Sequence, residues 1–381
     1  MTRIVIAADS FKGSATSQQV GEYLTNGIYQ VDPEASVVTV PMADGGEGTV
    51  ASVLAALGGE RRTTRVTGPV DQPVDATWGW LPAQHMAVIE MAAAAGLNLV
   101  QPDYAPRTAS TYGVGQLIDA ALTAGATTIY VGLGGSGTTD GGAGMLQALG
   151  ARLLTATGDP IPCGGAGLRE LALVDLSGLD ARLATVNLVA LTDVENVLTG
   201  PYGAAAVFGP QKGATPEMVQ ELDANLTHYQ AALAAQNAFP LSCPGDGAAG
   251  GTGFGLRLLG ATLAPGTATM LKLTQLAAKL QVADLVLTGE GRVDGQSLMG
   301  KAPIGVAKLA HAAQVPVILI AGSVGDDLAA VYAAGVDLVL SSTVAPMTVD
   351  QAIAQTKLLL TNAGATAMRA YQLGQPTELK R

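Results

Sequence analysis

The sequence predicts an α/β protein in which both chain ends build one Rossmann-like parallel-sheet domain, with a mixed α/β domain inserted between them. The composition is the first observation, because 49 glycines, 48% hydrophobic residues and only 4% aromatic residues suit strands and helices joined by glycine turns. The second is that apolar strand patterns alternate with helical patterns near both ends of the 381-residue chain. The third is that the N-terminal part offers too few strands for a stable sheet alone.

The N-terminal part has two strand–helix units. Residues 3–8 form an apolar run typical of a buried strand, and apolar residues then recur at helical spacing between residues 20 and 31. Residues 36–42 predict a second strand, and residues 50–57 predict the helix that follows it. This part therefore follows the order βαβα.

The same alternation returns after about residue 281. Strands are predicted within residues 283–294, 315–323 and 336–342, and helices within 304–313, 327–335 and the last part of the chain. Such alternation is typical of parallel sheets with crossover helices. We therefore predict one discontinuous domain from residues 1–65 and 281–381, an inserted domain from 66–280, and a ligand site in the cleft between them.

The inserted part is less regular. A strand pattern over residues 127–134 runs into a glycine loop, a helical pattern covers 145–151, and another strand pattern covers 186–193. We predict only that this domain mixes α and β structure.

The charge balance excludes several classes of partner. The chain has 20 Lys and Arg residues against 31 Asp and Glu residues, without a block of five or more basic residues, so nucleic acid and anionic membranes are poor partners. Cys163 and Cys243 match no disulfide or zinc spacing, and the start of the chain resembles a strand instead of a signal peptide. The apolar runs are too short to span a membrane, so we expect a cytoplasmic protein.

The first chemically informative segment is DSFKGS at residues 9–14. It places Asp9, Ser10 and Lys12 outside the carboxyl end of a strand and near a helix N-terminus, where anions bind well. Lys12 could hold a phosphate or a carboxylate. The alternative is a polar turn in which Ser14 or Thr16 caps the helix. Both remain open.

The second segment is ADGGEGT at residues 43–49, which follows the second predicted strand. Asp44 and Glu47 would repel ATP unless a divalent cation lay between them, which favours magnesium binding or proton abstraction. The alternative is an acidic, solvated turn.

The third segment, residues 132–145, is the best candidate for a phosphate loop because it follows a strand and opens a helix. The candidate phosphate-binding residues are Gly134, Gly135, Ser136, Gly137, Thr138, Asp140, Gly141 and Gly142. Gly132, Gly134 and Gly137 also have the spacing of a dinucleotide fingerprint, with Asp159 near the place of a ribose-binding acid. Because the glycines continue beyond that pattern, we favour a phosphate loop.

The fourth segment, residues 288–302, follows another strand. Gly295, Gly300 and Lys301 have Walker A spacing, but Ala302 stands where a metal-binding Ser or Thr is required, so this is not predicted to be a true P-loop. The segment still gathers Glu290, Arg292, Asp294 and Lys301, which could bind metal and phosphate or simply form ion pairs within the loop. Asp193 ends a further predicted strand.

Seven segments together resemble the class I bacterial glycerate kinase family, in the same order and at similar spacing over nearly the whole chain. They are DSFKGS, PMADGGEGT, TYGVG, GGSGTTDGGAGM, VFGPQKGA, DGAAGG and TGEGRVDGQSLMGKAP. The resemblance implies a two-domain α/β enzyme that uses ATP and Mg²⁺ to phosphorylate D-glycerate, with 2-phosphoglycerate as the usual product. Whether the chain forms a homo-oligomer is left open.

The family pattern also implies the residues of the site. On this basis Lys12, Arg292 and Lys301 hold the glycerate carboxylate and the ATP phosphates, with Ser10 beside them. Asp44 or Glu290 binds magnesium, and Asp193 or Asp294 accepts the proton of the substrate hydroxyl, while Lys12 also supports catalysis. Two alternatives remain: a non-catalytic hydroxy-acid sensor that shares the fold, and an NAD-dependent hydroxy-acid dehydrogenase suggested by the dinucleotide-like glycines.

Overall fold

The computed structural model describes residues 1–100, 105–237, 242–294 and 301–375. The chain divides into two compact units. The first unit comprises Met1–Asp44, Ala51–Leu57 and Thr267–Arg381, and the second comprises Gly45–Val50 and Gly58–Gly266. The cleft expected between the domains stays a prediction.

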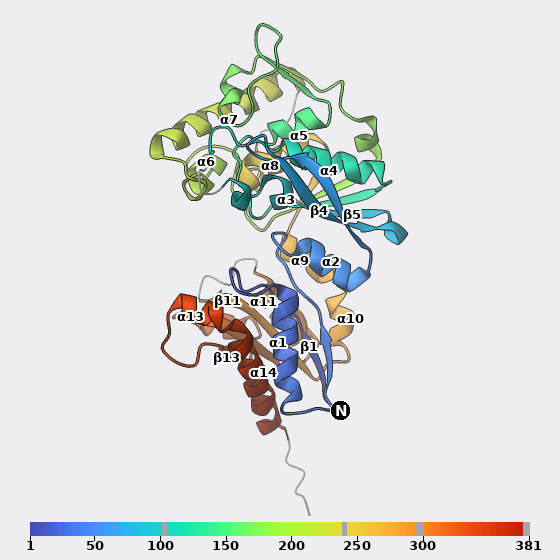
Figure 1. Cartoon of the computed structure of the whole chain (residues 1–381), viewed down its shortest axis with the longest axis vertical. Helices are drawn as coiled ribbons and strands as arrows, with labels where there is room; N and C mark the ends of the chain where they lie inside the picture. Colours follow the sequence, from blue (N-terminus) through green and yellow to red (C-terminus); the bar gives the residue numbers. More distant parts are fainter. Residues whose placement is uncertain (101–104, 238–241, 295–300, 376–381) are drawn as a thin grey trace, which may run out of the picture. The chain divides into compact units, whose positions relative to one another are not determined.

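A five-stranded sheet forms the centre of the first unit, and all its neighbouring strands are parallel. Its strands are β1 (Arg3–Ile6), β2 (Ser36–Thr39), β11 (Leu285–Val293), β12 (Val317–Val324) and β13 (Leu338–Ser341), in the spatial order β13, β12, β11, β1, β2. In Figure 1 the blue N-terminal and orange-to-red C-terminal segments share this sheet. Because β1 pairs with β11, the prediction that both chain ends build one parallel-sheet domain is confirmed.

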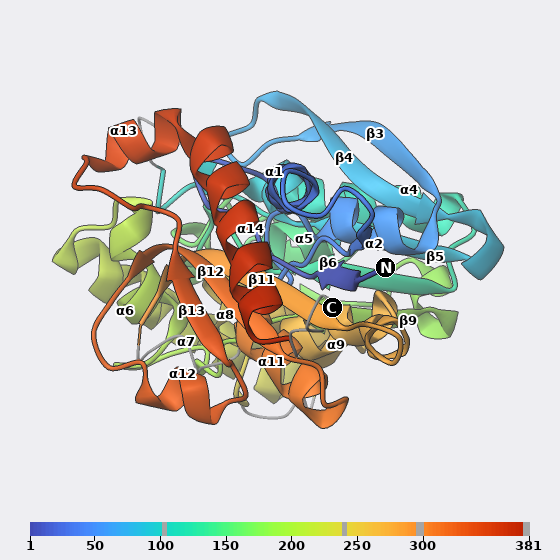
Figure 2. The ribbon, with the colours of Figure 1, turned by 90° about the horizontal axis from the view of Figure 1, so that it is seen from below.

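Helices cover both faces of this sheet, as the buried apolar stretches of its central strands β1, β11 and β12 require. Ile4 and Ile6 lie in one core with Leu24 and Leu360, whereas the buried Val5 between them points to the opposite face. Figure 2 shows α1 and α14 side by side on one face, while α11 packs on β11 and β12. The helices are α1 (Ser17–Tyr29), α2 (Thr49–Leu57), α9 (Gly266–Leu273), α10 (Leu276–Leu280), α11 (Ala302–Ala312), α12 (Ala329–Ala333), α13 (Val349–Ala354) and α14 (Thr356–Leu373).

The helix pair α1 and α14 depends on small residues. A side chain on Gly27 would collide with the carbonyl oxygen of Thr361, and one on Gly364 would collide with that of Leu24, so both glycines permit the close approach. At its start, α1 has a capping box in which Thr16 Oγ1 accepts from Gln19 N at 3.2 Å and Gln19 Oε1 accepts from Thr16 N at 3.0 Å. The cap expected from Ser14 or Thr16 is therefore supplied by Thr16.

The second unit contains a six-stranded mixed sheet. Its strands are β3 (Glu60–Thr67), β4 (Pro73–Leu81), β5 (Met86–Glu90), β6 (Thr128–Gly132), β9 (Asn187–Leu191) and β10 (Thr262–Ala264), in the order β10, β9, β6, β5, β4, β3. The four strands from β10 to β5 are parallel to their neighbours, and β4 and β3 are antiparallel. A separate hairpin joins β7 (Arg152–Leu154) and β8 (Leu173–Asp175).

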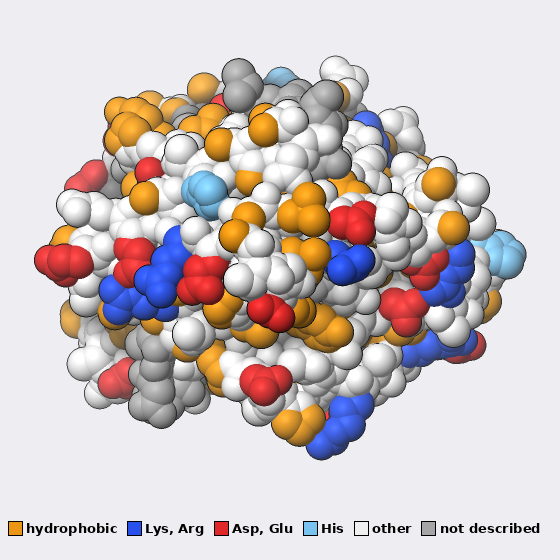
Figure 3. All heavy atoms as spheres, turned by 90° about the horizontal axis from the view of Figure 1, so that it is seen from above, with side chains coloured by type: hydrophobic (Ala, Val, Ile, Leu, Met, Phe, Trp, Pro, Cys, Tyr) orange, Lys and Arg blue, Asp and Glu red, His pale blue; other side chains and the backbone are white. Residues whose placement is uncertain are grey.

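The helices of the second unit pack around this sheet. They are α3 (Ala92–Ala95), α4 (Tyr112–Thr123), α5 (Ala143–Ala148), α6 (Ala204–Phe208), α7 (Pro216–Asn237) and α8 (Ala248–Leu258). Among the described residues, no helix combines the length and the apolar character needed to cross a membrane. On the face drawn in Figure 3, Lys and Arg side chains lie beside Asp and Glu side chains.

The unit boundaries differ from the expected ones at three places. Residues 45–50, expected in the parallel-sheet domain, belong to the second unit. Residues 60–65, expected in the parallel-sheet domain, belong to β3, which pairs along its length with β4 in the second unit. The β3–β4 hairpin was not predicted, although Val66, Trp78 and Trp80 on its inner face lie in the core of the second unit. Residues 267–280, expected in the inserted domain, form α9 and α10 of the first unit, where α10 packs against α11.

Candidate active site

The strand order of the first unit marks the place where a ligand is expected. Counting only its own strands along the chain, the sheet has the doubly wound order 2-1-3-4-5, so the winding direction reverses between β1 and β11. In open parallel sheets, ligands bind outside the carboxyl ends of the strands at this switch point. Hydrogen bonds from Ala7 N to Leu287 O (2.8 Å) and from Asp9 N to Gly289 O (2.9 Å) continue the pairing beyond β1. Asp9 thus lies beside the end of β11.

A cavity of about 370 Å³ lies at this switch point. Its charged side chains come from the segments that follow β1 and β2, from the last part of β11, and from the residue that caps α11. The lining consists of Asp9, Ser10, Lys12, Asp44, Glu290, Gly291, Arg292, Lys301 and Ala302. Six residues predicted from separate sequence segments are therefore brought together, namely Ser10, Lys12, Asp44, Glu290, Arg292 and Lys301.

Ion pairs organise the α11 side of the cavity. Lys301 Nζ lies 2.9 Å from Glu290 Oε2 and donates to the carbonyl oxygen of Arg292 at 3.4 Å. Arg292 Nε donates to Asp294 Oδ2 at 3.1 Å. Glu290 is only 13% exposed whereas Lys301 is 40% exposed, so the ammonium group is the more accessible partner. The ion-pair alternative for this loop is therefore real, and three of the paired groups, Glu290, Arg292 and Lys301, also line the cavity. Gly295 and Gly300 of the Walker-like spacing lie outside the described residues.

Asp9 is the lining residue to which the sequence analysis assigned no role. The pKa of its carboxyl is raised to about 7, first by burial and then by the negative charge of Asp44. The hydrogen bond from Ser10 N (2.6 Å) and the charge of Lys12 act in the opposite direction. Its position directly after the buried strand pattern was the signal that could have identified it.

The predicted phosphate loop lies in the second unit, between β6 and α5, and several amides in and beside it have partners within the protein. Gly134, Gly137 and Gly141 donate to the carbonyl oxygens of Gly45, Ala95 and Gly250, respectively, at 3.3, 2.8 and 3.0 Å. The amides of Gly142 and Gly144 donate to the Asp140 carboxylate at 3.1 and 3.2 Å. In this structure these amides hold the loop itself, and a role in phosphate binding stays a prediction for the loop.

Two charged side chains are buried in this loop region. Asp140 is fully buried and also accepts from Thr111 N and Thr111 Oγ1, both at 2.8 Å; burial raises its pKa, and these hydrogen bonds oppose the rise. Lys212 is 1% exposed and donates to Ser136 Oγ (2.9 Å) and Thr138 O (2.6 Å). Burial lowers the pKa of Lys212 to about 7, and the charge of Asp140 opposes that effect. Within the described residues, the buried hydroxyl groups of Thr138, Thr139 and Tyr229 have no hydrogen-bond partner.

The remaining predicted residues lie apart from the cavity lining. Asp193 is exposed and follows β9 in the second unit. Asp294 is half-buried beside Arg292 in the first unit. Asp159, considered as a ribose-binding acid, is exposed in the loop of the β7–β8 hairpin, where it accepts from Thr157 Oγ1 at 2.9 Å. Within the described residues, no group of three or more His, Cys, Asp or Glu side chains forms a ready-made metal site.

Together, the doubly wound sheet and the mixed carboxylate and cation cavity at its carboxyl edge are typical of α/β enzymes. Residues 4–372 match the model of the glycerate kinase family. The chain therefore belongs to the glycerate kinase family, and the resemblance seen in its motifs is confirmed.

Individual relatives support this assignment over nearly the whole length. The chain is 47% identical to the glycerate kinase of Halalkalibacterium halodurans, over 95% of this chain and 96% of the relative. It is 46% identical to the glycerate 2-kinase of Escherichia coli K12, over 92% of this chain and 93% of the relative. A crystal structure assigned to glycerate kinase 2 from Salmonella typhimurium LT2 matches with a TM-score of 0.86 at 42% identity, covering 98% of this chain and 99% of that chain. These findings support neither the sensor nor the dehydrogenase alternative.

Proposed function

We propose that this chain transfers the γ-phosphoryl group of ATP to a hydroxyl of D-glycerate and releases 2-phosphoglycerate. Membership of the glycerate kinase family supports the reaction, and 46% identity to a relative named glycerate 2-kinase supports the 2-position. The unpaired Cys163 and Cys243 suit a reducing compartment, which supports a cytoplasmic location.

The observation that carries the proposal is the cavity at the switch point between β1 and β11. Phosphoryl transfer depends mainly on positioning and on neutralising charge, and this cavity offers three cationic side chains, Lys12, Arg292 and Lys301, for anionic oxygens. We assign these three to the glycerate carboxylate and the phosphates, with the Ser10 hydroxyl beside them. Ala302 places the N-terminus of α11 at the same cavity, where the helix dipole favours anions.

The carboxylates of the cavity fit Mg²⁺. This ion prefers oxygen ligands and is usually held by one or two carboxylates together with substrate phosphates, so it does not require a ready-made three-residue site. Asp44 and Glu290 both line the cavity and would hold it. When bound, Mg²⁺ neutralises negative charge on the phosphates. Lys301 pairs with Glu290 in this structure, so we expect the lysine to exchange this partner for a phosphate when the nucleotide binds.

The group that accepts the hydroxyl proton has three candidates. Asp193 and Asp294 follow from the family pattern, and Asp9 joins them because it lines the cavity with Lys12 and Glu290. Asp294 already accepts from Arg292, which orients both side chains. Substitution to Asn at each of the three positions distinguishes them, because only the true acceptor should lose turnover while keeping its affinity for nucleotide.

The test is to incubate the purified chain with ATP, MgCl₂ and D-glycerate and to follow the products by phosphorus NMR, which resolves the two phosphoglycerates. We expect 2-phosphoglycerate and ADP in equal amounts. Formation of 3-phosphoglycerate would overturn the regiochemistry, and no phosphorylated glycerate would overturn the proposed activity. Glu290→Gln should abolish most turnover, and Glu22→Gln on the exposed side of α1 serves as its matched control.

A further inference from the structure

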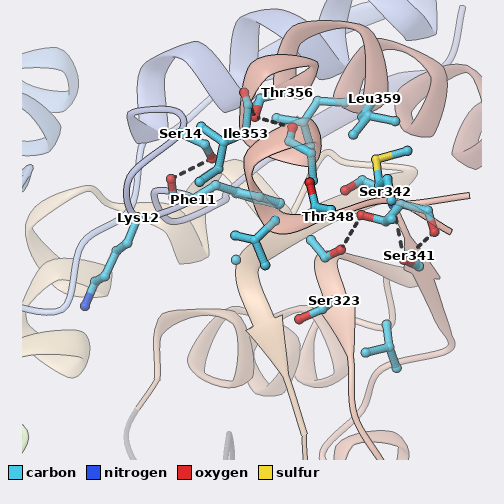
Figure 4. Close-up of a pocket in the computed structure, with 18 residues that line it drawn as sticks. Phe11, Lys12, Ser14, Ser323, Ser341, Ser342, Thr348, Ile353, Thr356 and Leu359 are labelled. Carbon is cyan, nitrogen blue, oxygen red and sulfur yellow. Dashed lines mark hydrogen bonds between the residues drawn. The ribbon is translucent and has the colours of Figure 1, made fainter. Parts of the chain in front are cut away.

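A second cavity lies in the first unit, beyond the ends of β12 and β13 (Figure 4). Its volume is about 430 Å³, within the range of about 300–1,000 Å³ that is usual for small-molecule sites. The segment after β1, the ends of β12 and β13, and the helices α13 and α14 contribute to its lining. The roles assigned so far to the charged cavity leave this one without an occupant.

One part of this cavity is apolar. Phe11 and Leu359 are buried core residues at 5% and 6% exposure, and Ile353 extends the surface from α13. A side chain on Gly322 would meet the carbonyl oxygen of Gly291 at 2.6 Å and the Phe11 ring at 3.5 Å, so glycine keeps this end open. The surface suits a flat, apolar group.

Another part of the cavity is lined by hydroxyl groups. Several have partners within the protein: Ser14 Oγ donates to Phe11 O at 2.9 Å, and Ser341 Oγ donates to Thr343 O at 3.0 Å. Ser323 and Ser342 differ, because their hydroxyl groups make no side-chain hydrogen bond within the described part of the chain, and Ser342 is only 4% exposed. These two hydroxyl groups can donate to or accept from the polar atoms of a ligand.

The two cavities are neighbours that share part of their lining, because Lys12 and Gly291 line both. In Figure 4 the Lys12 side chain extends away from the labelled hydroxyl groups. A ligand that spans both cavities therefore needs a flat head with polar atoms for one cavity and an anionic tail that passes Lys12 into the other. Glycerate is too small and too polar to meet the first requirement, whereas a nucleoside triphosphate meets both.

We propose that the cavity lined by Phe11, Ser323, Ser342 and Leu359 binds the adenosine part of ATP, with the triphosphate passing Lys12 into the charged cavity. The inference rests on the proposed kinase function and places its nucleotide within the first unit. It differs from the sequence expectation, which assigned phosphate binding to residues 134–142 of the second unit. The charged cavity then holds both the phosphates and the acceptor.

The test uses a substitution that reduces the volume of the adenosine cavity and lies outside the lining of the charged cavity. Ala352 on α13 lines the cavity, so Ala352→Trp should fill part of it; Ala354→Trp on the same helix is the matched control, because Ala354 is exposed and outside the lining. Titration calorimetry with MgADP on the full chain should give a Kd raised at least about tenfold for Ala352→Trp and unchanged for Ala354→Trp. Tripolyphosphate should bind both variants as it binds the wild type, and the KM for D-glycerate should stay the same.

Equal ADP affinity in wild type and both variants would overturn the inference. Photolabelling of the wild-type chain with 2-azido-ADP provides a second measurement that needs no variant. Label on residues 341–360 is expected, and label confined to the second unit would overturn the proposal. Turnover of the wild type is scored separately: a chain that phosphorylates glycerate but labels elsewhere refutes only this cavity assignment, whereas correct labelling without turnover refutes only the proposed activity.

Discussion

The cavity of the first unit and the glycine loop of the second unit contain the same kinds of residue and differ in what those residues face. Lys301 is 40% exposed and lines an open cavity, whereas Lys212 is 1% exposed and donates to Ser136 and Thr138. Similarly, Glu290 lines the cavity, whereas Asp140 is buried among backbone and hydroxyl donors. Charged residues and glycines after a strand therefore predict a loop with an ordered network of polar contacts. They do not predict whether those contacts bind a ligand or stabilise the fold.

The difference follows from the supply of donors. Around Asp140, four hydrogen bonds from the amides and hydroxyl of neighbouring residues replace the lost hydration. At the first-unit cavity, Asp9 lies near the like charges of Asp44 and Glu290, which burial makes costly. The Asp140 carboxylate is therefore stabilised by the protein alone, whereas a bound cation would stabilise the carboxylates of the first-unit cavity. The following predictions separate these two cases, because one should lose activity and the other stability.

The largest effect is expected for Asp9→Asn. Whether Asp9 accepts the hydroxyl proton or orders the cavity for the metal and phosphate, turnover should fall by about 10²–10⁴. Stability should not decrease, because the substitution removes repulsion with Asp44. Steady-state kinetics and thermal unfolding measure the two effects, with the exposed Asp326→Asn as control. A kcat near that of the wild type would remove Asp9 from the site.

Asp140→Asn should show the opposite behaviour. The amide keeps one acceptor oxygen but turns its NH₂ group either toward Gly142 N, which donates to Oδ1, or toward Thr111 and Gly144, which donate to Oδ2. Either orientation leaves buried donors without acceptors. We expect a loss of about 2–4 kcal/mol in the free energy of unfolding, measured by denaturant titration. Asp159→Asn, at an exposed position in the same unit, is the control. A normal unfolding free energy with weakened ATP binding would instead restore Asp140 to the phosphate-binding role expected from sequence.

The fold of the first unit was predictable because its signals are local. Buried parallel strands appear as short apolar runs, and the scarcity of strands at the N-terminus required a partner from the C-terminal part, as the pairing of Ile4 with Leu285 confirms. The β3–β4 hairpin was missed because its alternation is partial: its outer positions carry Arg and Thr, and its inner face includes small residues such as Ala76. The boundary at residue 65 was misplaced for the same reason.

The candidate site was predictable as a set of segments but not as a geometry. Lys12, Glu290 and Lys301 follow strands or precede a helix, and strand order then places them in one cavity. The burial of Asp9 and Lys212 depends on side chains far away in sequence, so no local pattern reveals it. No local pattern reveals the adenosine cavity either, because Ser323 and Ser342 lie at strand ends where serine is common.

The smallest effect concerns the buried Lys212 of the second unit. It is the dependence of the free energy of unfolding on pH. The Lys212 ammonium has a pKa of about 7 in the folded chain, against an ordinary value of 10.5, because burial disfavours the charged form. Between these values the unfolded chain binds more protons than the folded chain, so the wild type should gain stability as pH rises, by about 1.4 kcal/mol per unit at most. Lys212→Met removes this titration, so the difference in unfolding free energy between wild type and variant should shift by about 2 kcal/mol in favour of the wild type between pH 7 and pH 8.5. Lys308→Met, at an exposed position on α11, should leave the pH profile unchanged. If the Lys212→Met and wild-type profiles run parallel, Lys212 stays charged in the fold, and the loop of the second unit then resembles the ligand-facing cavity of the first unit more than its burial indicates.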